Sequence, residues 1–255
     1  MSRRIKFGDQ VIDGIASWRS SYSSRAVAEV FPRRDGGIIQ SATFMSPRTV
    51  AVTGIASKDT EALLDTHMDD LAERLVNLGL NKLYKDAADS RYLNAIMQKY
   101  EEGESATGMA PTRERTFRID FLAHDPYWYA ASESSDSNWV PAASPETKTL
   151  TNSGGTGTPP RFEIENTSGA DLTGTLILKH MTLGSEISWT GTISNGSTLI
   201  IDCGEYTIMQ GGTNKMFGFD SGSEFFDLIM GTNDIRYTGD LNVSIDSYWR
   251  HRWGS

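Results

Sequence analysis

The sequence predicts a mainly β protein of two domains, in which the N-terminal domain is α+β, β-sandwich-like and contains one helix. Three observations predict this class. Short alternations of apolar and polar residues recur along the chain, one stretch has the period of an amphipathic helix, and the composition becomes polar and acidic near residue 131. A chain of 255 residues also exceeds the ~100 to 150 of one ordinary domain. We therefore expect an N-terminal domain over residues 1–131, a linker over 132–160 and a C-terminal β-sandwich over 161–255.

The first half begins with short strands separated by Gly and Pro. Ile5–Ile15, Gly37–Met45 and Thr49–Ile55 are the expected strands. One helix follows, with Ser57 as its expected N-cap and Gly79 as its C′ residue. Its apolar face has the spacing of a core-facing stripe and consists of Leu64, Met68, Leu71, Leu75 and Leu78.

A hairpin is expected after the helix. Its strands are Lys82–Asp86 and Arg91–Tyr100, joined by a turn over Ala87–Ser90, and a loop over Glu101–Gly108 follows. Three tyrosines lie on this hairpin, namely Tyr84, Tyr92 and Tyr100. They can cover the edge of the sheet, or they can reach a neighbouring copy of the protein, so we treat them as candidate subunit-interface residues.

A strand that runs into an aromatic turn marks the end of the first domain. Residues 117–121 alternate in a strand pattern, and Asp125-Pro126 then ends the strand because proline fixes its φ and has no amide donor. The aromatic residues that follow are Tyr127, Trp128 and Tyr129. They can pack under the domain edge or offer a platform for a stacked ligand. Because no polar groups converge on them, we predict packing at the domain end.

The linker and the C-terminal half differ in composition from the first half. Residues 152–158 are Asn, Ser, Gly and Thr and are followed by Pro159-Pro160 instead of a helix, so they predict a loop and not a phosphate-binding site. From residue 161 onward, strand patterns recur about every 8 to 12 residues, which is typical of a sandwich or a jelly roll. Asn195-Gly196 is the clearest hairpin turn among them.

Charge and composition exclude several classes of function. Residues 1–130 carry 17 Lys/Arg and 18 Asp/Glu, whereas residues 131–255 carry 7 and 15, so most of the net charge of −9 is in the second half. Nucleic-acid binding depends on clustered basic residues, which neither half has. No run approaches the ~20 apolar residues of a membrane span, and the basic start lacks the apolar core of a secretory signal, so we expect a protein that stays in the cell that makes it.

The sequence gives little support for catalysis, a metal or a cofactor. The histidines His67, His124, His180 and His251 are isolated from one another, and no pair has the spacing of a helical metal site. In His124-Asp125 the two side chains of a strand point to opposite faces. Cys203, the only cysteine, follows an apolar strand and is expected to be a buried structural thiol. The Asp220–Glu224 segment has oxygen ligands without the order of a calcium loop. We predict a protein that is not an enzyme.

The order of several short motifs resembles that of the distal tail proteins (Dit) of long-tailed, non-contractile bacteriophages. The run FLAHDPYWYA, over residues 121–130, resembles the end of their N-terminal domain. The start, with Phe7-Gly8 and Gly14, fits the form F-G-x-x-x-x-x-G, and Asn195–Asp202 and Met230–Ile235 resemble the forms G-x-x-L-x-I-D and G-x-N-x-I. This resemblance implies a galectin-like jelly roll for the C-terminal domain and a projecting hairpin over Lys82–Glu102 that clasps the next subunit.

The resemblance also implies a function. It describes a structural virion protein at the distal end of the tail, assembled in the host cytoplasm, whose N-terminal domains form a ring of six copies. The implied partners are copies of itself, the tail tube protein, and tail-tip and receptor-binding proteins. The alternative is a carbohydrate-binding module, in which the candidate aromatic planes are Trp189 and the pair Trp249 and Trp253. A likeness to a lectin fold alone does not favour that alternative.

Overall fold

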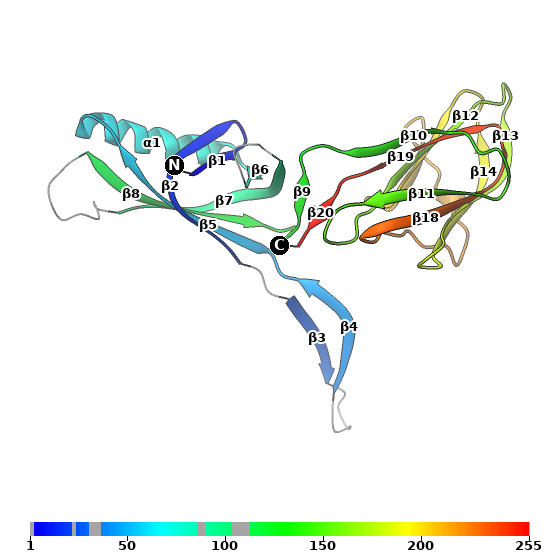
Figure 1. The fold of residues 1–255 in the computed structure, drawn as a ribbon, viewed down its shortest axis with the longest axis horizontal. Coiled ribbons are helices and arrows are strands. Elements are labelled where there is room, and N and C mark those ends of the chain that lie inside the picture. Colours follow the sequence, from blue (N-terminus) through cyan, green and yellow to red (C-terminus); the bar gives the residue numbers. More distant parts are fainter. Residues whose placement is uncertain (1–2, 22–23, 31–36, 86–89, 104–112, 255) are drawn as a thin grey trace. The chain divides into compact units, whose positions relative to one another are not determined.

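The computed structural model describes residues 3–21, 24–30, 37–85, 90–103 and 113–254. The chain divides into two compact units, Met1–Ala131 and Ser132–Ser255, which Figure 1 draws from blue through to red. The mainly β class is confirmed, because strands dominate both units and the described residues contain one α-helix. That helix, α1, is not long and apolar enough to cross a membrane, and it is the only α-helix in the described ranges.

Most of the strands described in the first unit form one antiparallel sheet that closes on itself. Their bounds are β1 Arg3–Phe7, β2 Gln10–Ser21, β5 Arg48–Ser57, β6 Asn81–Tyr84, β7 Arg91–Gly103, β8 Glu114–Ala123 and β9 Trp128–Ala130. Their order is β9-β7-β6-β1-β2-β5-β8, and β8 also pairs with β7. This last pairing, which the sequence pattern did not predict, leaves few strand edges open in the sheet.

The strand predicted over Ile5–Ile15 is in fact two strands, β1 and β2. Gly8 has a φ of +57° and turns the chain between them. Gly14 then bends β2, since its φ is +72° and a Cβ there would clash with the carbonyl oxygen of Ile55. Only glycine adopts such a conformation without strain. The bend lets the two halves of β2 pair with different neighbours, β1 and β5.

The helix α1, Glu61–Asn77, begins later than the sequence predicted. The expected N-cap, Ser57, lies in β5, and the cap is Thr60, whose hydroxyl oxygen accepts the amide of Leu63 at 3.3 Å. The predicted stripe is correct for its first four members, which are the buried residues Leu64, Met68, Leu71 and Leu75. Gly79 follows the helix with a φ of +57°, as expected of a C′ residue.

The hairpin that lies apart from the large sheet is not the predicted one. β6 and β7 pair as expected, with Tyr84 opposite Tyr92, but they are internal strands of the closed sheet. A separate two-stranded sheet consists instead of β3, Ser24–Val30, and β4, Gly37–Met45 (Figure 1). Residues 86–89 and 104–112, with most of the predicted turn and loop, lie outside the described residues.

The second unit is a sandwich of two antiparallel sheets, as predicted. The first sheet has the order β10-β19-β12-β15-β16-β17 and the second the order β11-β18-β13-β14. The bounds of the strands are β10 Ser134–Trp139, β11 Glu146–Asn152, β12 Arg161–Asn166, β13 Leu172–His180, β14 Glu186–Ile193, β15 Thr198–Asp202, β16 Thr207–Gln210, β17 Thr213–Asn214, β18 Gly231–Thr238, β19 Val243–Trp249 and β20 Arg252–Trp253. A 3₁₀-helix spans Met216–Gly218. The two sheets share one core of buried aliphatic and aromatic side chains.

Residues 132–160 do not form the linker without strands that the sequence predicted. They contain β10 and β11, which are the first strands of the two sheets in the second unit. Both are rich in Ser, Thr and Asn, and most of their outward residues are polar, so they lack the apolar alternation that predicts a strand. Their buried apolar residues, Trp139 and Leu150, join the shared core.

Candidate functional site: a tyrosine row and the end of the first unit

Three tyrosines form a row across neighbouring strands of the first unit. Tyr84 lies opposite Tyr92, and Tyr92 lies opposite Tyr129 of β9. The ring centroids are 6.1 Å apart in the first pair and 5.9 Å in the second, which is stacked. The ammonium of Lys6 lies 5.1 Å from the centre of the Tyr84 ring, and that of Lys82 lies 4.5 Å from the Tyr92 ring. Cation–π contacts of this kind orient the rings across the sheet. We call Tyr84, Tyr92 and Tyr129 the tyrosine row.

Tyr100 is not brought together with Tyr84 and Tyr92. It lies further along β7, roughly 26 Å from Tyr92 at the usual rise of a strand. Its hydroxyl donates to the carbonyl oxygen of Met68 in α1 at 3.5 Å. Burial raises the pKa of Tyr100, and the nearby Glu102 raises it further. Tyr100 therefore binds the helix to the sheet, and an interface role for Tyr84 and Tyr92 stays a prediction.

The aromatic residue at the end of the first unit, Trp128, is buried. Its ring lies 5.9 Å from that of Trp18, and the guanidinium of Arg48 lies 5.9 Å from it. Arg48 is itself buried and donates to the hydroxyl of Ser20 at 3.0 Å. Because Trp128 is covered in this way, it offers no open face for a stacked ligand.

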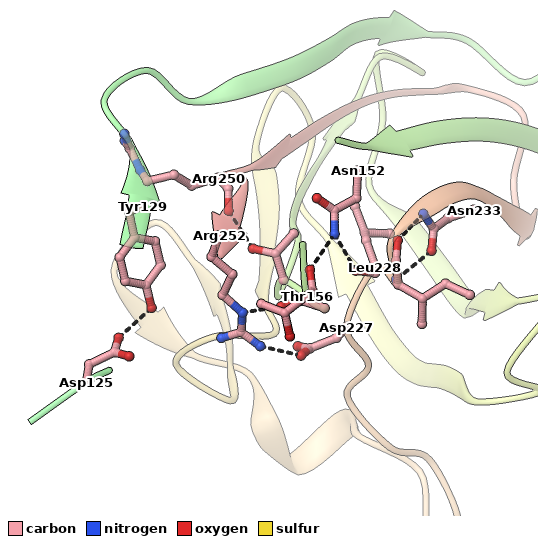
Figure 2. A network of polar contacts seen from close by, with 12 residues as sticks. Asp125, Tyr129, Asn152, Thr156, Asp227, Leu228, Asn233, Arg250 and Arg252 are labelled. Atoms are coloured by element: carbon pink, nitrogen blue, oxygen red, sulfur yellow. Dashed lines mark hydrogen bonds and ion pairs between the residues drawn. The ribbon is translucent and has the colours of Figure 1, made fainter. Parts of the chain in front are cut away.

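The carboxylate of Asp125 is used to hold the aromatic turn. It accepts the backbone amide of Tyr127 at 3.2 Å and the hydroxyl of Tyr129 at 2.5 Å, and Figure 2 shows the second bond. His124 is exposed and, like Asp125, follows the end of β8, so the strand alternation expected for this pair does not apply. The neighbouring pair His124-Asp125 therefore does not act as one site.

The other candidates for chemistry are engaged in structure. Burial raises the pKa of the Cys203 thiol to about 12, so the thiol is protonated at neutral pH. Burial also lowers the pKa of His67. The carboxylate of Asp220 accepts the hydroxyl of Ser188. Within the described residues, no three His, Cys, Asp or Glu side chains are placed to hold a metal ion.

The tryptophans named as possible sugar platforms are mostly in the core. Trp189 is buried, and its indole N–H donates to the carbonyl oxygen of Lys215 at 2.9 Å. Trp249 is buried in the same core, and Trp253 is partly exposed. A sugar ring needs the open face of an aromatic side chain, which Trp189 and Trp249 do not present.

The glycine-rich segment 152–158 holds the end of the chain, as Figure 2 shows. A Cβ on Gly154 would lie 2.6 Å from the carbonyl oxygen of Arg252, so only glycine allows this approach. The guanidinium of Arg252 donates to the carbonyl of Gly157 and, at 2.6 Å, to the carboxylate of Asp227. We call the segments 152–158 and 250–253 the C-terminal clasp. The sequence predicted a loop over residues 152–158 but did not indicate that residues 250–253 pack against it.

A buried amide and a histidine complete the C-terminal clasp. Asn152 is buried and donates to two backbone carbonyl groups at 2.9 Å each. Nδ1 of His251 lies 3.2 Å from the amide nitrogen of Ser153 and 3.1 Å from Oδ1 of Asn152, and Nε2 lies 3.0 Å from the hydroxyl oxygen of Ser134. Burial lowers the pKa of His251, which favours the neutral ring.

The motif over Met230–Ile235 is explained by a second buried amide. Gly231 has a φ of +94°, which other residues rarely adopt. The side chain of Asn233 is buried, donates to the carbonyls of Ile229 and Gly231 at 2.9 Å, and accepts the amide of Ile229 at 2.7 Å. Ile235 then enters the core. Each fixed position of the motif has a structural role.

Residues 153–253, which include most of the clasp and this motif, match the family model described as the siphovirus-type tail component, C-terminal domain. Over these residues the chain is similar to the siphovirus-type tail components. The resemblance to distal tail proteins predicted from the motifs is thereby confirmed. Among curated proteins, none matches the sequence significantly.

A solved phage protein shares the fold over nearly the whole chain. The crystal structure of SPP1 Dit, described as a paradigm of the hub adsorption apparatus in phages that infect Gram-positive bacteria, matches with a TM-score of 0.74 and 15% identity over 98% of both chains. The baseplate of phage P2 in its activated conformation with Ca matches with a TM-score of 0.44 and 10% identity, over 98% of both chains. At these identities the likeness to SPP1 Dit is one of fold.

Proposed function

We propose that this chain is a structural hub protein at the distal end of the tail of a long-tailed bacteriophage. The observation that carries the proposal is the tail component domain over residues 153–253, together with a fold over the whole chain like that of SPP1 Dit. In this proposal the first units of six copies close into a ring that continues the tail tube. The second units present their sandwiches to tail-tip and receptor-binding proteins.

Several features of the chain support a role in assembly rather than in catalysis. Asp125, His251 and Arg252 are bound to structural partners, and Cys203 is buried with a raised pKa. We infer that the protein acts through its interfaces and is not an enzyme.

Electron microscopy of virions labelled with an antibody against the second unit tests this function. We expect label confined to the end of the tail distant from the capsid. Label along the whole tail would identify a tube protein instead, and label on the capsid would refute a tail role. Loss of the gene product should give tails that do not attach to host cells.

A further inference from the structure

A pocket with an apolar floor opens on one flank of α1, between the helix, β2 and the end of β5. Its volume is about 240 Å³, larger than the ~150 Å³ cavity that holds a benzene molecule in a protein core. Leu71 and Phe117 are buried in its floor. Val11 and Ile55 line it and remain 52% and 42% exposed. We call it the socket.

A pair of exposed apolar residues lies at the C-terminal end of the same helix. Val76 is 61% exposed and Leu80 is 69% exposed, and neither belongs to the buried stripe that faces the sheet. Val76 lies in the last turn of α1, and Leu80 follows it by four positions, beyond the end of the helix. We call Val76 and Leu80 the knob.

The knob residue Val76 and the socket lie on opposite flanks of α1. His67 lines the socket, and Val76 follows it by nine positions, which is two and a half turns at 3.6 residues per turn. A surface and its complement on opposite sides of one unit cannot satisfy each other within that unit. They can meet only between copies, head to tail, and such contacts form rings when the rotation closes.

The charges beside the two surfaces are opposite. Asp69 precedes Val76 by seven positions, so it lies on the same flank, and it is exposed. Lys58 lines the socket and is exposed. Neither has an ion-pair partner among the residues that the structure describes. Asp13, a carboxylate that lines the socket, is paired with Arg4 at 2.6 Å.

We propose that neighbouring copies join by insertion of the knob of one first unit into the socket of the next, with Asp69 facing Lys58 of that neighbour. This inference rests on the proposed ring and names its contact. Each copy then uses its knob on one side and its socket on the other.

Two variants of the full chain test the contact by mixing. Val76→Asp places a carboxylate where the apolar socket would leave it unpaired, and Ile55→Asp does the same from the socket side. Each variant alone should associate roughly a hundredfold more weakly and remain at the monomer mass of 28.1 kDa. In an equal mixture, one intact knob meets one intact socket, so dimers of twice 28.1 kDa should form, with no larger species.

The control is Val140→Asp, an exposed apolar residue of the second unit, 60% exposed, which should leave the assembly unchanged. Melting curves from circular dichroism check that all three variants fold. If both variants kept the mass of the wild-type assembly, or if one of them formed dimers by itself, the contact would be wrong while the ring stood. A wild-type protein that stayed monomeric at all concentrations would overturn the ring as well.

A charge exchange tests the polar part of the contact separately. Asp69→Lys and Lys58→Asp should each weaken association roughly tenfold, because each places like charges opposite one another. The double variant restores opposite charges in reversed order and should recover most of the loss. If the double variant lost as much affinity as the two single variants together, Asp69 and Lys58 would not face each other in the interface.

Discussion

The two units of the chain are closed in different ways. The first unit is closed by its backbone, because pairing of β7 with β8 joins the ends of the sheet. The second unit has open sheet edges at β11 and β14 and is tied together by buried side-chain amides. Its buried polar residues are Asn152, Thr158, Asn166, His180, Gln210, Asn233 and Ser247, whereas the first unit buries only Arg48 among the described residues.

This difference explains where the sequence is recognisable. A backbone ladder accepts many side chains as long as the inward positions are apolar, so its sequence is loosely determined. A loop held by Asn233 and Gly231 accepts few alternatives, because the amide bonds and the positive φ depend on those residues. The family match over residues 153–253 falls on the unit of the second kind.

The largest effect is expected from loss of the aromatic packing at the end of the first unit. Trp128→Ala removes a buried side chain that contacts Trp18 and should cost the first unit about 3 to 5 kcal/mol of unfolding free energy. Calorimetry should show that the transition of the second unit is unchanged, since the two units have separate cores. Tyr127→Ala, at a partly exposed position, is the control and should cost much less. Equal loss in both transitions would show that the units unfold as one.

Loss of a buried amide should be the next largest effect, and it should be confined to the second unit. Asn233→Ala leaves the carbonyls of Ile229 and Gly231 without their donor and should cost about 2 to 3 kcal/mol. Asn94→Ala, an exposed position of the first unit, should change the unfolding free energy by less than about 0.5 kcal/mol. Chemical denaturation measures both. A similar cost at the two positions would break the contrast drawn between the units.

A smaller effect is expected at the C-terminal clasp. Gly154→Ala places a Cβ against the carbonyl of Arg252 and should cost about 1 to 3 kcal/mol, because backbone must move. Gly174→Ala is a matched control in the same unit, since a Cβ there meets nothing within 4 Å. Limited proteolysis of the chain end should follow the same order. If the end of the chain were equally protected in both variants, the clasp would not hold it.

The smallest effect concerns pH. Burial lowers the folded-state pKa of His251 below its ordinary value of 6.5, so the unfolded chain takes up the proton first as pH falls. The stability of the second unit should therefore be full above about pH 6.5 and should decline as pH falls through that value toward the folded pKa. In His251→Asn this part of the decline should disappear. An unchanged pH profile in the variant would exclude His251 as its source.

The sequence predicted the elements of this fold better than their partners. The stripe of α1 was readable because periodicity reports which face of an element is buried. The strand over Gly37–Met45 was predicted from the Gly and Pro that break the chain around it. Periodicity does not say which strands pair, so the closure through β7 and β8 could not be derived. The strands β10 and β11 were missed because their polar residues resemble a linker.

The candidate site shows the same limit. Cys203 and Trp189 could be predicted as core residues, because Cys203 follows an apolar strand and Trp189 lies within a strand. The tyrosine row was only half predicted, because Tyr129 joins Tyr92 through strand register. Tyr100 was grouped with Tyr84 and Tyr92 because all three lie on the predicted hairpin. The strand β7 is long, and Tyr100 lies near its other end, against α1. The glycines of the clasp signal a turn, and nothing local says that Arg252 lies against them.

The central claim is that this chain forms closed rings through its first unit. Mass measurement of the protein alone by light scattering, across concentrations, tests it most directly. The account predicts one assembly whose mass is a fixed multiple of 28.1 kDa, most simply six, and does not grow further with concentration. A protein that remains monomeric under every condition, or that forms ever longer polymers, would contradict the account.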